Sequence, residues 1–465
     1  MYRKKLHLHF VGIGGIGMSG IAKILKFQGH KISGCDLDLS QKSIKDLKAI
    51  GCEIYHGNNT PQCKSDDIDV LVYSSAIRSH DPEIIAAQKR GIPTIPRALM
   101  LAELMRTKYS VAIGGSHGKT TTTSLISHIL IEAKLDPTVI IGGHLKNIST
   151  NALFGEGDYL VAEADESDRS LTHLQATLAV ITNIDLEHLE TYTDLDDIKK
   201  TFTIFLNNLP FYGKAFLCSD DKNLMSILPM PHIKIIKYGI DKNEADLYAL
   251  DISLNPDNST FQVWEKSTNK PLGKITIYMP GKHNVQNCLA AIAVSMDLGI
   301  DFPTITKAIT NFKGIERRFC YKGTFRGAEI FDDYGHHPKE IKNTIEIAKK
   351  RAKKKLIVVF QPHRYTRTHK LWDHFLDAFT QNEMDMLIIT DIYPASEDPI
   401  ANINSKNLVA AIRQKNPTIP VMYIPYDADF SDITKHIQGI ANSDDLILSL
   451  GAGKITNLAQ ELAKI

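Results

Sequence analysis

The chain has 465 residues, enough for about three domains that each bury a hydrophobic core. It carries 54 lysines and arginines against 53 aspartates and glutamates, so it offers no overall positive field for nucleic acid or an anionic membrane. A hydrophobic content of 43% and a charged content of 23% are typical of a globular protein and argue against disorder. We therefore expect neither a nucleic-acid partner nor a membrane partner.

The cysteines and the apolar segments indicate the compartment. None of the six cysteines belongs to a CxxC pair, so the sequence indicates neither a cysteine-paired zinc site nor a disulfide framework and favours reducing conditions. No stretch approaches the roughly 20 apolar residues that a membrane-spanning helix needs. The basic residues at the N-terminus lead into a glycine loop rather than into an unbroken apolar segment. We expect a cytoplasmic protein.

Short apolar runs alternate with longer amphipathic stretches along the whole chain. This alternation predicts an α/β fold with parallel sheets covered by helices, and the region 240–280 is expected to be locally antiparallel. A second strand–loop–helix unit restarts near residue 108 and a third α/β pattern near residue 315. In chain order, the predicted strands are 8–11, 70–73, 111–113, 159–162, 178–182, 356–360, 386–390 and 446–449, and the predicted helices include 17–28, 120–133 and 338–351.

A G-x-G-x-x-G sequence extends from Gly12 to Gly17, directly after the first predicted strand and before a helix. Its glycines allow backbone N–H groups at a helix N-terminus to approach a phosphate closely. Asp36 lies 19 residues after Gly17, where an acid would bind a ribose in a dinucleotide fold. Read alone, the motif indicates NAD. Any nucleoside diphosphate would fit the same geometry, and glycines that serve only helix–sheet packing are a third interpretation.

A second glycine loop is the strongest local signal in the chain. The sequence Gly-Ser-His-Gly-Lys-Thr-Thr at 115–121 follows a predicted strand and opens a threonine-rich helix. Backbone N–H groups there would hold phosphate oxygens, Lys119 would neutralise the β- and γ-phosphates, and Thr120 would bind Mg²⁺. The loop is shorter than the common phosphate loop, because Ile113 stands where the first glycine of that pattern is expected. We predict ATP binding at this loop.

Two polar clusters follow the next predicted strands. Carboxylates at the C-terminal ends of strands beside a phosphate loop are suited to Mg²⁺, which prefers oxygen ligands. A solvated acidic turn is the alternative interpretation for the first cluster, and a histidine that serves only local structure is the alternative for the second. The first cluster comprises Glu163, Asp165, Glu166 and Asp168, and the second comprises Asp185, Glu187 and His188.

Two further patterns concern the nucleotide and a third substrate. Asn284 and Asn287 are three residues apart, so they share one helical face and could pair with a base edge, although a plain N-cap is the favoured interpretation. The segments 332–338 and 361–367 are rich in histidine and arginine and each follows a predicted strand, so we expect the two loops to converge. Arginines there would bind carboxylate or phosphate oxygens. A zinc site formed by these histidines is the rival interpretation.

Taken together, these loops resemble those of the Mur ligases over essentially the whole chain. The resemblance depends on the ordered set GIGGIGMSGIA, GSHGKTTTTS, VAEADESD, TNIDLEH, GKHNVQN, RRF, DDYGHHP and FQPHRYTRT. It implies a UDP-sugar-binding Rossmann-like domain at 1–107, a central ATP-binding domain with a parallel sheet of the P-loop ATPase type at 108–314, and a C-terminal Rossmann-like domain that brings the amino acid at 315–465. It also removes the NAD interpretation of the first glycine loop.

The resemblance implies an ATP-dependent amide ligase of peptidoglycan precursor synthesis. The carboxylate of UDP-N-acetylmuramate would attack the γ-phosphate of ATP to give an acyl phosphate. The amine of L-alanine would then displace phosphate through a tetrahedral intermediate. The implied cofactors are ATP and Mg²⁺, with Mn²⁺ as a substitute. The partners are the two substrates, and we expect a monomer or a dimer.

Site residues carry over at the positions that match the family motifs. Lys119, His188, His336, Arg364 and Arg367 are the implied catalytic residues, and Thr120, Glu163 and His188 the implied metal ligands. The implied contacts to ATP are Gly115, Ser116, His117, Gly118, Lys119, Thr120, Thr121, His283, Asn284, Asn287, Arg318 and Asp333. The UDP-sugar would contact Gly12, Gly14, Gly15, Gly17, Asp36 and Ser74, and the acyl phosphate and amino acid would contact Tyr334, His336, His363, Arg364 and Arg367.

The chain departs from the family pattern at a few positions. Ser116 replaces a threonine but keeps the hydroxyl, the run 168–171 differs, Ser396 replaces a glycine and Lys454 replaces an acidic residue. None of these changes removes a group that the chemistry requires. Three rival functions remain: a recycling ligase that attaches a preformed peptide to UDP-N-acetylmuramate, a non-catalytic sensor of cell-wall precursors, and a dehydrogenase.

Overall fold

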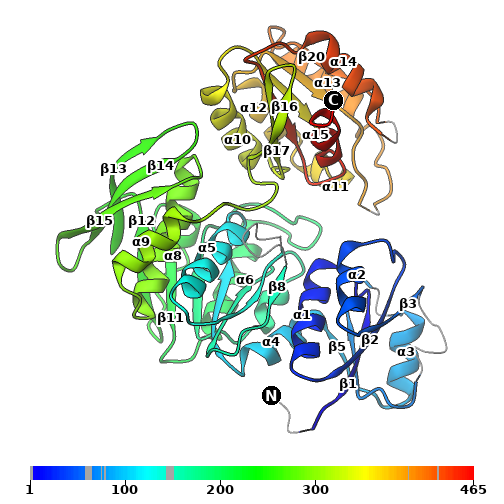
Figure 1. Cartoon of the computed structure of the whole chain (residues 1–465), viewed down its shortest axis with the longest axis vertical. Coiled ribbons are helices and arrows are strands. Elements are labelled where there is room, and N and C mark those ends of the chain that lie inside the picture. The colour runs from blue at the N-terminus through cyan, green and yellow to red at the C-terminus, as the bar shows by residue number, and fades with distance from the viewer. Residues whose placement is uncertain are drawn as a thin grey trace.

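The computed structural model describes residues 4–57, 65–74, 76–77, 80–142, 151–395, 397–426 and 429–465. Figure 1 shows three lobes that follow one another along the chain, each built around its own sheet with helices packed against it. The α/β architecture expected from the alternation of apolar and amphipathic segments is therefore confirmed. Ser396 lies outside the described residues.

The first lobe contains a five-stranded sheet with the strand order β3-β2-β1-β4-β5, and every pairing in it is parallel. All five residues of β1 are buried, as expected for a strand covered on both faces. The glycine loop separates β1 from α1. The strands are β1 (His7–Val11), β2 (Lys31–Asp36), β3 (Glu53–His56), β4 (Val70–Tyr73) and β5 (Thr94–Pro96), and the helices are α1 (Ile16–Phe27), α2 (Lys42–Ala49), α3 (Pro82–Lys89) and α4 (Arg97–Met105).

The central lobe has a ten-stranded sheet with the order β15-β14-β13-β12-β11-β10-β6-β9-β7-β8. Its centre is parallel, whereas β13, β14 and β15 pair antiparallel, which confirms the expectation for 240–280. The other edge also ends in an antiparallel strand, β8, which the sequence analysis missed because two residues are too few to show a pattern. The helices of this lobe are α5 (Lys119–Glu132), α6 (Leu195–Asn207), α7 (Lys222–Met225), α8 (Lys282–Asp297) and α9 (Phe302–Thr310), with a 3₁₀ turn at Ser170–His173.

The strands of the central sheet are β6 (Tyr109–Gly114), β7 (Thr138–Ile140), β8 (Ala152–Leu153), β9 (Tyr159–Glu163), β10 (Leu178–Ile181), β11 (Lys214–Cys218), β12 (Lys234–Gly239), β13 (Leu247–Leu254), β14 (Ser259–Glu265) and β15 (Lys270–Ile277). Strands β6, β9 and β10 are neighbours in this sheet, so the loops that follow them meet at one edge. The phosphate loop and both acidic clusters follow these three strands.

The third lobe has a six-stranded sheet with the order β16-β17-β21-β18-β19-β20, in which only β16 and β17 pair antiparallel. Alternate residues of β18 face opposite cores, because successive side chains of a strand point to opposite faces. The strands are β16 (Cys320–Phe325), β17 (Ala328–Asp333), β18 (Leu356–Phe360), β19 (Met386–Ile389), β20 (Val421–Tyr423) and β21 (Leu446–Leu450). The helices are α10 (Pro338–Arg351), α11 (Tyr365–Lys370), α12 (Trp372–Thr380), α13 (Ser405–Lys415), α14 (Ser431–Ile440) and α15 (Thr456–Leu462).

The lobes differ in how they are joined. One buried apolar cluster extends from Leu8 in the first lobe to Ile315 after α9, so the first two lobes share a continuous core. The third lobe has two apolar clusters of its own, and Leu189 is the residue of the central lobe that packs against one of them. Ion pairs such as Lys339 with Asp185 and Arg367 with Glu187 also join the third lobe to the central lobe. Within the described residues, no helix is both long enough and apolar enough to cross a membrane.

Candidate functional site

The phosphate loop lies between β6 and α5, and its glycines occupy positions that a side chain would not fit. Gly115 has a φ of 128° and Gly118 a φ of 85°, both in the left-handed region. A Cβ on Gly115 would lie 2.1 Å from the Thr182 hydroxyl oxygen, and one on Gly118 would lie 2.5 Å from Oδ1 of Asn287. The close packing leaves the loop backbone fixed in position at the N-terminus of α5.

Lys119, the first residue of α5, points back over this loop. Its Nζ donates to the carbonyl oxygens of Gly115 at 2.5 Å and Ser116 at 3.2 Å, and lies 2.6 Å from Oε1 of Glu166. Burial lowers the pKa of Lys119, but the carboxylates of Glu166 and Glu187 outweigh burial and raise it. The ammonium therefore stays charged at the mouth of the loop, where it can neutralise a phosphate.

The predicted metal ligands fall into two adjacent groups. The Glu163 carboxylate accepts from the Gly142 N–H at 3.0 Å and lies near the Thr120 hydroxyl. Burial raises the pKa of Glu163. His188 instead lies with Glu166 and Glu187, and one ligand atom of each lies within 4.8 Å of the others. The sequence analysis placed Glu166 and Glu187 in the acidic clusters but did not select them as ligands.

This second group offers carboxylate oxygens that could bind a magnesium ion. Oε2 of Glu166 is buried and has no hydrogen-bond partner among the residues that the structure describes. Burial lowers the pKa of His188, but the carboxylates of Glu166 and Glu190 raise it to about 10. Carboxylate oxygens are the preferred protein ligands of Mg²⁺, so Glu166 and Glu187 fit that ion, and His188 would join them only after losing its proton.

A cavity of about 410 Å³ lies beside the phosphate loop, between the central and third lobes. Eight of the residues predicted to contact ATP line it: His117, Gly118, Thr121, His283, Asn284, Asn287, Arg318 and Asp333. Arg318 lies 3.5 Å from Glu340, which also lines the cavity. Oxygens of Asp333 accept from the Phe319 and Gly335 N–H groups, both at 2.7 Å, so this carboxylate also fixes the loops around the cavity.

The asparagine pair has a role other than the favoured one. Gly281, with a φ of 103°, is the N-cap of α8, so the interpretation of the asparagines as a plain N-cap is wrong. Asn284 donates to the Pro280 carbonyl at 2.8 Å, and Nδ2 of Asn287 lies 3.4 Å from Oδ1 of Asn284. A glycine can adopt the positive φ that begins this helix, and the amides of Asn284 and Asn287, on its first and second turns, line the cavity.

The two histidine-rich loops of the third lobe converge, as predicted. The rings of His336 and His363 are 5.8 Å apart, and Nη1 of Arg367 lies 3.1 Å from Nδ1 of His363. Burial and Arg367 lower the pKa of His336 to about 4, and burial, with His336 and Arg367 beside it, lowers that of His363 to about 3. In the described chain neither ring belongs to a metal-sized cluster, whereas the neighbouring His337 forms one with His117 and Asp185.

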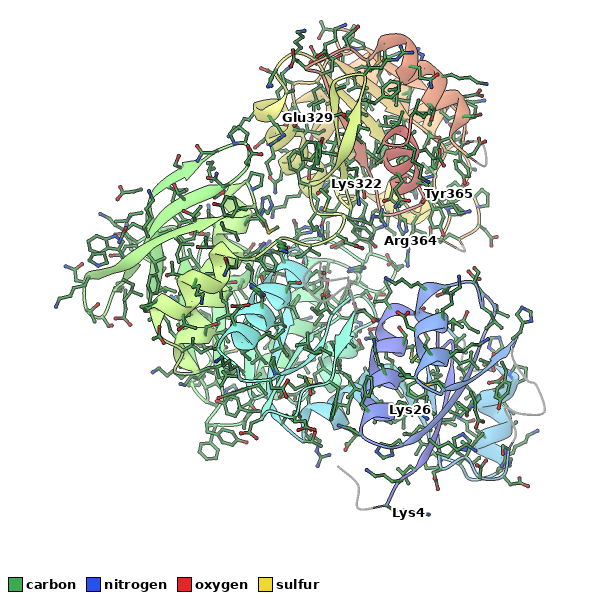
Figure 2. The ribbon with its side chains drawn as sticks, viewed as in Figure 1. Lys4, Lys26, Lys322, Glu329, Arg364 and Tyr365 are labelled. Atoms are coloured by element: carbon green, nitrogen blue, oxygen red, sulfur yellow. The ribbon has the colours of Figure 1, made fainter. Side chains whose placement is uncertain are left out.

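The loop 185–190 of the central lobe contacts the third lobe through charged side chains. Glu187 lies 3.6 Å from Arg367 and 3.9 Å from His336. Arg364 lies 3.2 Å from Glu190, and Figure 2 shows Arg364 and Tyr365 at the edge of the third lobe that faces the rest of the molecule. Tyr334 packs beside His336, with ring centroids 5.2 Å apart. His336 and Arg367, two of the predicted acyl-phosphate residues, therefore lie close to Glu187, a member of the candidate metal group.

The first glycine loop lies on the first lobe. Gly12 has a φ of 77°, and the N–H of Gly14 donates to Oδ2 of Asp36 at 2.8 Å. Asp36 therefore holds the loop itself, in addition to any ligand. Ser74 follows β4 and lies against Gly12, where an added Cβ would be 3.3 Å from the Ser74 Cβ. Gly15 is the N-cap of α1, so the loop ends at the positive end of that helix.

Sequence reasoning missed Arg97, which links this loop to the central lobe. A Cβ on Gly17 would lie 3.1 Å from Nη1 of Arg97, and Nη2 of Arg97 lies 3.3 Å from Asp165. The pKa of Asp165 is lowered because Arg97 and Lys119 outweigh its burial. Arg97 directly follows β5, so the rule that ligands gather after parallel strands could have found it, but β5 has only three residues and was not predicted.

Glu340 was also missed. Its carboxylate lies 3.6 Å from His117 and 3.5 Å from His336, and it helps to cap α10. A glutamate three residues into a helix is a common capping pattern, and nothing in the sequence separates that role from a site role.

The departures from the family pattern are accommodated locally. The Ser116 hydroxyl accepts from the Asp185 N–H at 2.8 Å. Arg169 pairs with Asp197 and lies over the Tyr192 ring at 4.6 Å, so it contributes no contact to the phosphate loop. Lys454 is exposed.

Comparison with known proteins agrees with this arrangement. Three family models match in chain order: the Mur ligase family catalytic domain at 7–109, the Mur ligase middle domain at 113–295 and the Mur ligase glutamate ligase domain at 317–453. UDP-N-acetylmuramate–L-alanine ligase from Geotalea uraniireducens is 46% identical over 100% of this chain and 99% of its own length. The corresponding protein from Syntrophus aciditrophicus is 45% identical over 99% and 94%.

Solved structures give the same grouping. UDP-N-acetylmuramate-alanine ligase MurC from Thermotoga maritima superposes with a TM-score of 0.80 at 25% identity, covering 99% of this chain and 98% of that one. A murein peptide ligase from Psychrobacter arcticus shares the fold, with a TM-score of 0.72 at 24% identity and 99% coverage of both chains. The three matched domain models and the full-length relatives establish that this chain belongs to the Mur ligase family.

Proposed function

We propose that this chain joins L-alanine to the carboxylate of UDP-N-acetylmuramate, with ATP as the energy source, and releases ADP and phosphate. The single observation that carries the proposal is the convergence of Lys119, the carboxylates of the central lobe and Arg367 of the third lobe around one position. Full-length relatives that are 45–46% identical and carry this activity in their names support the choice of substrates.

In the first step, an oxygen of the muramyl carboxylate attacks the γ-phosphorus and the bond to the ADP oxygen breaks. Phosphoryl transfer depends on positioning and charge neutralisation rather than on a covalent protein group. Lys119 would lie against the β- and γ-phosphates, and Arg367 would hold the transferred phosphoryl oxygens from the third lobe. The cavity beside His283, Asn284 and Asn287 would take the base.

The carboxylates and Thr120 described above would hold Mg²⁺, which would neutralise phosphate charge when bound. Glu163 and Thr120 would form one position, and Glu166 and His188 the other. Glu166 contacts both Lys119 and His188, so these contacts would have to change when a cation binds.

In the second step, the amine of L-alanine attacks the acyl carbon and the carbon–oxygen bond to phosphate breaks. The attacking amine must be neutral, so a group nearby has to take a proton from the ammonium. His336 and His363 are neutral at pH 7 because their pKa values are about 4 and 3. Rings with such low pKa values are weak bases, so they would orient the amine by accepting a hydrogen bond from it while a nearby water takes the proton. Arg364 and Arg367 would hold the amino-acid carboxylate or the acyl phosphate.

The first lobe would bind the UDP-sugar. Gly12, Gly14, Gly15 and Gly17 would approach the diphosphate, and Asp36 and Ser74 would support the loop from either side. We further propose the domain division 1–107, 108–314 and 315–465, a cytoplasmic location, and a monomer or dimer in solution.

The test is phosphate release from ATP by purified protein with Mg²⁺ and UDP-N-acetylmuramate, with and without L-alanine. We expect release that depends on both substrates, and a product whose mass equals the two joined with loss of water. Glycine, L-serine and a tripeptide serve as alternative amines.

The other outcomes would each replace the proposal. Release with the tripeptide but not with L-alanine would place the chain among peptide-recycling ligases. Silence with every amine, together with tight binding of UDP-N-acetylmuramate, would indicate a sensor. Binding of a nicotinamide cofactor at the first glycine loop would indicate a dehydrogenase.

A further inference from the structure

We propose that the first lobe contains a buried binding site for a zinc ion, formed by His9, Cys35 and Glu83. The three residues come from separate elements, β1, β2 and α3, and they are 0%, 1% and 2% exposed. One ligand atom of each lies within 4.8 Å of the others. The site lies in the first lobe, so it is separate from the carboxylates of the phosphate loop and does not depend on the proposed ligase activity.

The spacing of the ligand atoms fits tetrahedral zinc. Sγ of Cys35 lies 3.2 Å from Oε2 of Glu83, and Nε2 of His9 lies 3.6 Å from the same oxygen. Zinc bonds of about 2.3 Å to sulfur and about 2.0–2.2 Å to nitrogen or oxygen require ligand atoms roughly 3.3–3.6 Å apart. The ligand atoms of His9 and Cys35 lie within 4.8 Å of each other, so an approach of up to about 1 Å between them would give a three-ligand site, with a fourth position for water.

The histidine ring is already oriented for such a bond. Nδ1 of His9 contacts the Ser33 hydroxyl at 2.8 Å, which directs Nε2 toward Glu83. The same hydroxyl contacts Nε2 of His7 at 2.7 Å. A metal-binding histidine commonly uses its second nitrogen in this way, because that hydrogen bond fixes both the tautomer and the direction of the ring.

The charges of the three ligands suit a dication in a buried place. Binding would convert the Cys35 thiol to a thiolate and release its proton to solvent. A thiolate, a carboxylate and a neutral imidazole together neutralise Zn²⁺, so the loaded site would carry no net charge into the core. A thiolate–imidazole–carboxylate set favours zinc over Mg²⁺ or Ca²⁺, which prefer oxygen ligands.

The location suggests what the ion would do. The carbonyl oxygen of Cys35 accepts from the N–H groups of Gly12 at 2.9 Å and Ile13 at 3.1 Å. The next residue, Asp36, holds Gly14. A zinc ion at Cys35 would tie β1, β2 and α3 together behind the first glycine loop and stiffen the segment that this loop depends on.

The experiment measures the metal content of the full chain, expressed with zinc in the medium, dialysed and analysed by mass spectrometry. We expect an equimolar amount of zinc that falls to background in Cys35→Ser and in Glu83→Gln but persists in Cys52→Ser. Cys52 is the matched control, since it is a buried cysteine of the same lobe that faces the apolar core.

Cobalt gives a second readout that the carboxylates near Lys119 cannot produce. Co²⁺ added to the metal-free chain should give a thiolate-to-cobalt charge-transfer band in the near ultraviolet, absent in Cys35→Ser and retained in Cys52→Ser. A wild-type chain that holds no more zinc than Cys35→Ser would overturn the proposal. A cobalt spectrum of the wild-type chain without that band would also overturn the proposal. Because this measurement needs no variant, it remains valid if a variant fails to fold.

Discussion

The two glycine loops of this chain have the same strand–loop–helix form but different electrostatic surroundings. In the first loop a carboxylate, Asp36, binds a loop N–H, and the helix that follows begins with the apolar residue Ile16. In the second loop the helix begins with Lys119, whose ammonium faces the carboxylate of Glu166.

The difference separates holding a phosphate from transferring it. Glycines with left-handed or crowded backbones only allow close approach of a diphosphate, and both loops have them. Transfer also needs charges that neutralise the phosphoryl group and its metal ion, and within the described residues these surround the second loop. Glycine spacing by itself therefore indicates that a loop binds phosphate, whereas the charged residues around the loop indicate whether it can transfer phosphate.

Removing the charge from the second loop should have the largest effect. We expect Lys119→Ala to lower kcat by about 10³-fold or more, because one group that neutralises the transferring phosphate is lost. The affinity for UDP-N-acetylmuramate, measured by calorimetry, should stay within about twofold, since the first loop is untouched. Phosphate release near the wild-type rate would show that the second loop is not the transfer site.

Exchanging a glycine for alanine in each loop would separate the two binding functions. Gly118→Ala places a Cβ 2.5 Å from Asn287 at a φ of 85°, and Gly14→Ala places one 2.8 Å from Oδ2 of Asp36. We expect the first variant to weaken ATP binding and the second to weaken UDP-sugar binding, each by about tenfold or more, in line with strain of about 1–3 kcal/mol. If either variant weakened both ligands equally, the loops would not act separately.

The elements that carry these loops could be predicted from sequence far better than the contacts between them. The strands at 70–73 and 356–360 and the helix at 338–351 have the predicted bounds, because each combines a strong period with clear flanking residues. The short strands β5 and β8 were missed, since two or three residues carry no period.

For the site too, individual residues could be predicted from sequence better than the contacts between them. Lys119 and the convergence of His336 with His363 could be foreseen, because loops after parallel strands share one edge of a sheet. The pairings of Glu340 with His117 and of Arg97 with Asp165 join residues far apart in sequence, and no local pattern encodes them. The buried cluster of His9, Cys35 and Glu83 was missed for the same reason.

A variant of Arg97 would test whether this arginine supplies the positive charge beside the first glycine loop. It lies beside Gly17 and pairs with Asp165, so it can exchange that partner for a phosphate of the UDP-sugar. We expect Arg97→Ala to raise KM for UDP-N-acetylmuramate by about tenfold, the worth of one charged hydrogen bond, with a smaller change in KM for ATP. Arg106→Ala is the matched control, because Arg106 directly follows the same helix, pairs with Glu103 and is exposed. An equal effect of both variants would assign the result to the helix and not to Arg97.

The smallest expected effect concerns the pH dependence of the second loop, which contains a histidine that the first loop lacks. Burial lowers the pKa of His117, but Asp185 and Glu340 raise it from 6.5 to about 9. The charged ring therefore stabilises the folded chain fully below pH 6.5, and this contribution disappears as the pH rises from 6.5 through 9. We expect His117→Gln to lower Tm by about 1 °C at pH 6.5, the shift that a loss of about 1 kcal/mol gives in a chain of this length, and to match the wild type near pH 10. Scanning calorimetry without nucleotide at both pH values would measure this. A Tm difference that persisted at pH 10 would mean that His117 stabilises the contact between the central and third lobes by packing. The charge on this loop would then contribute to nucleotide binding and not to the stability of the fold.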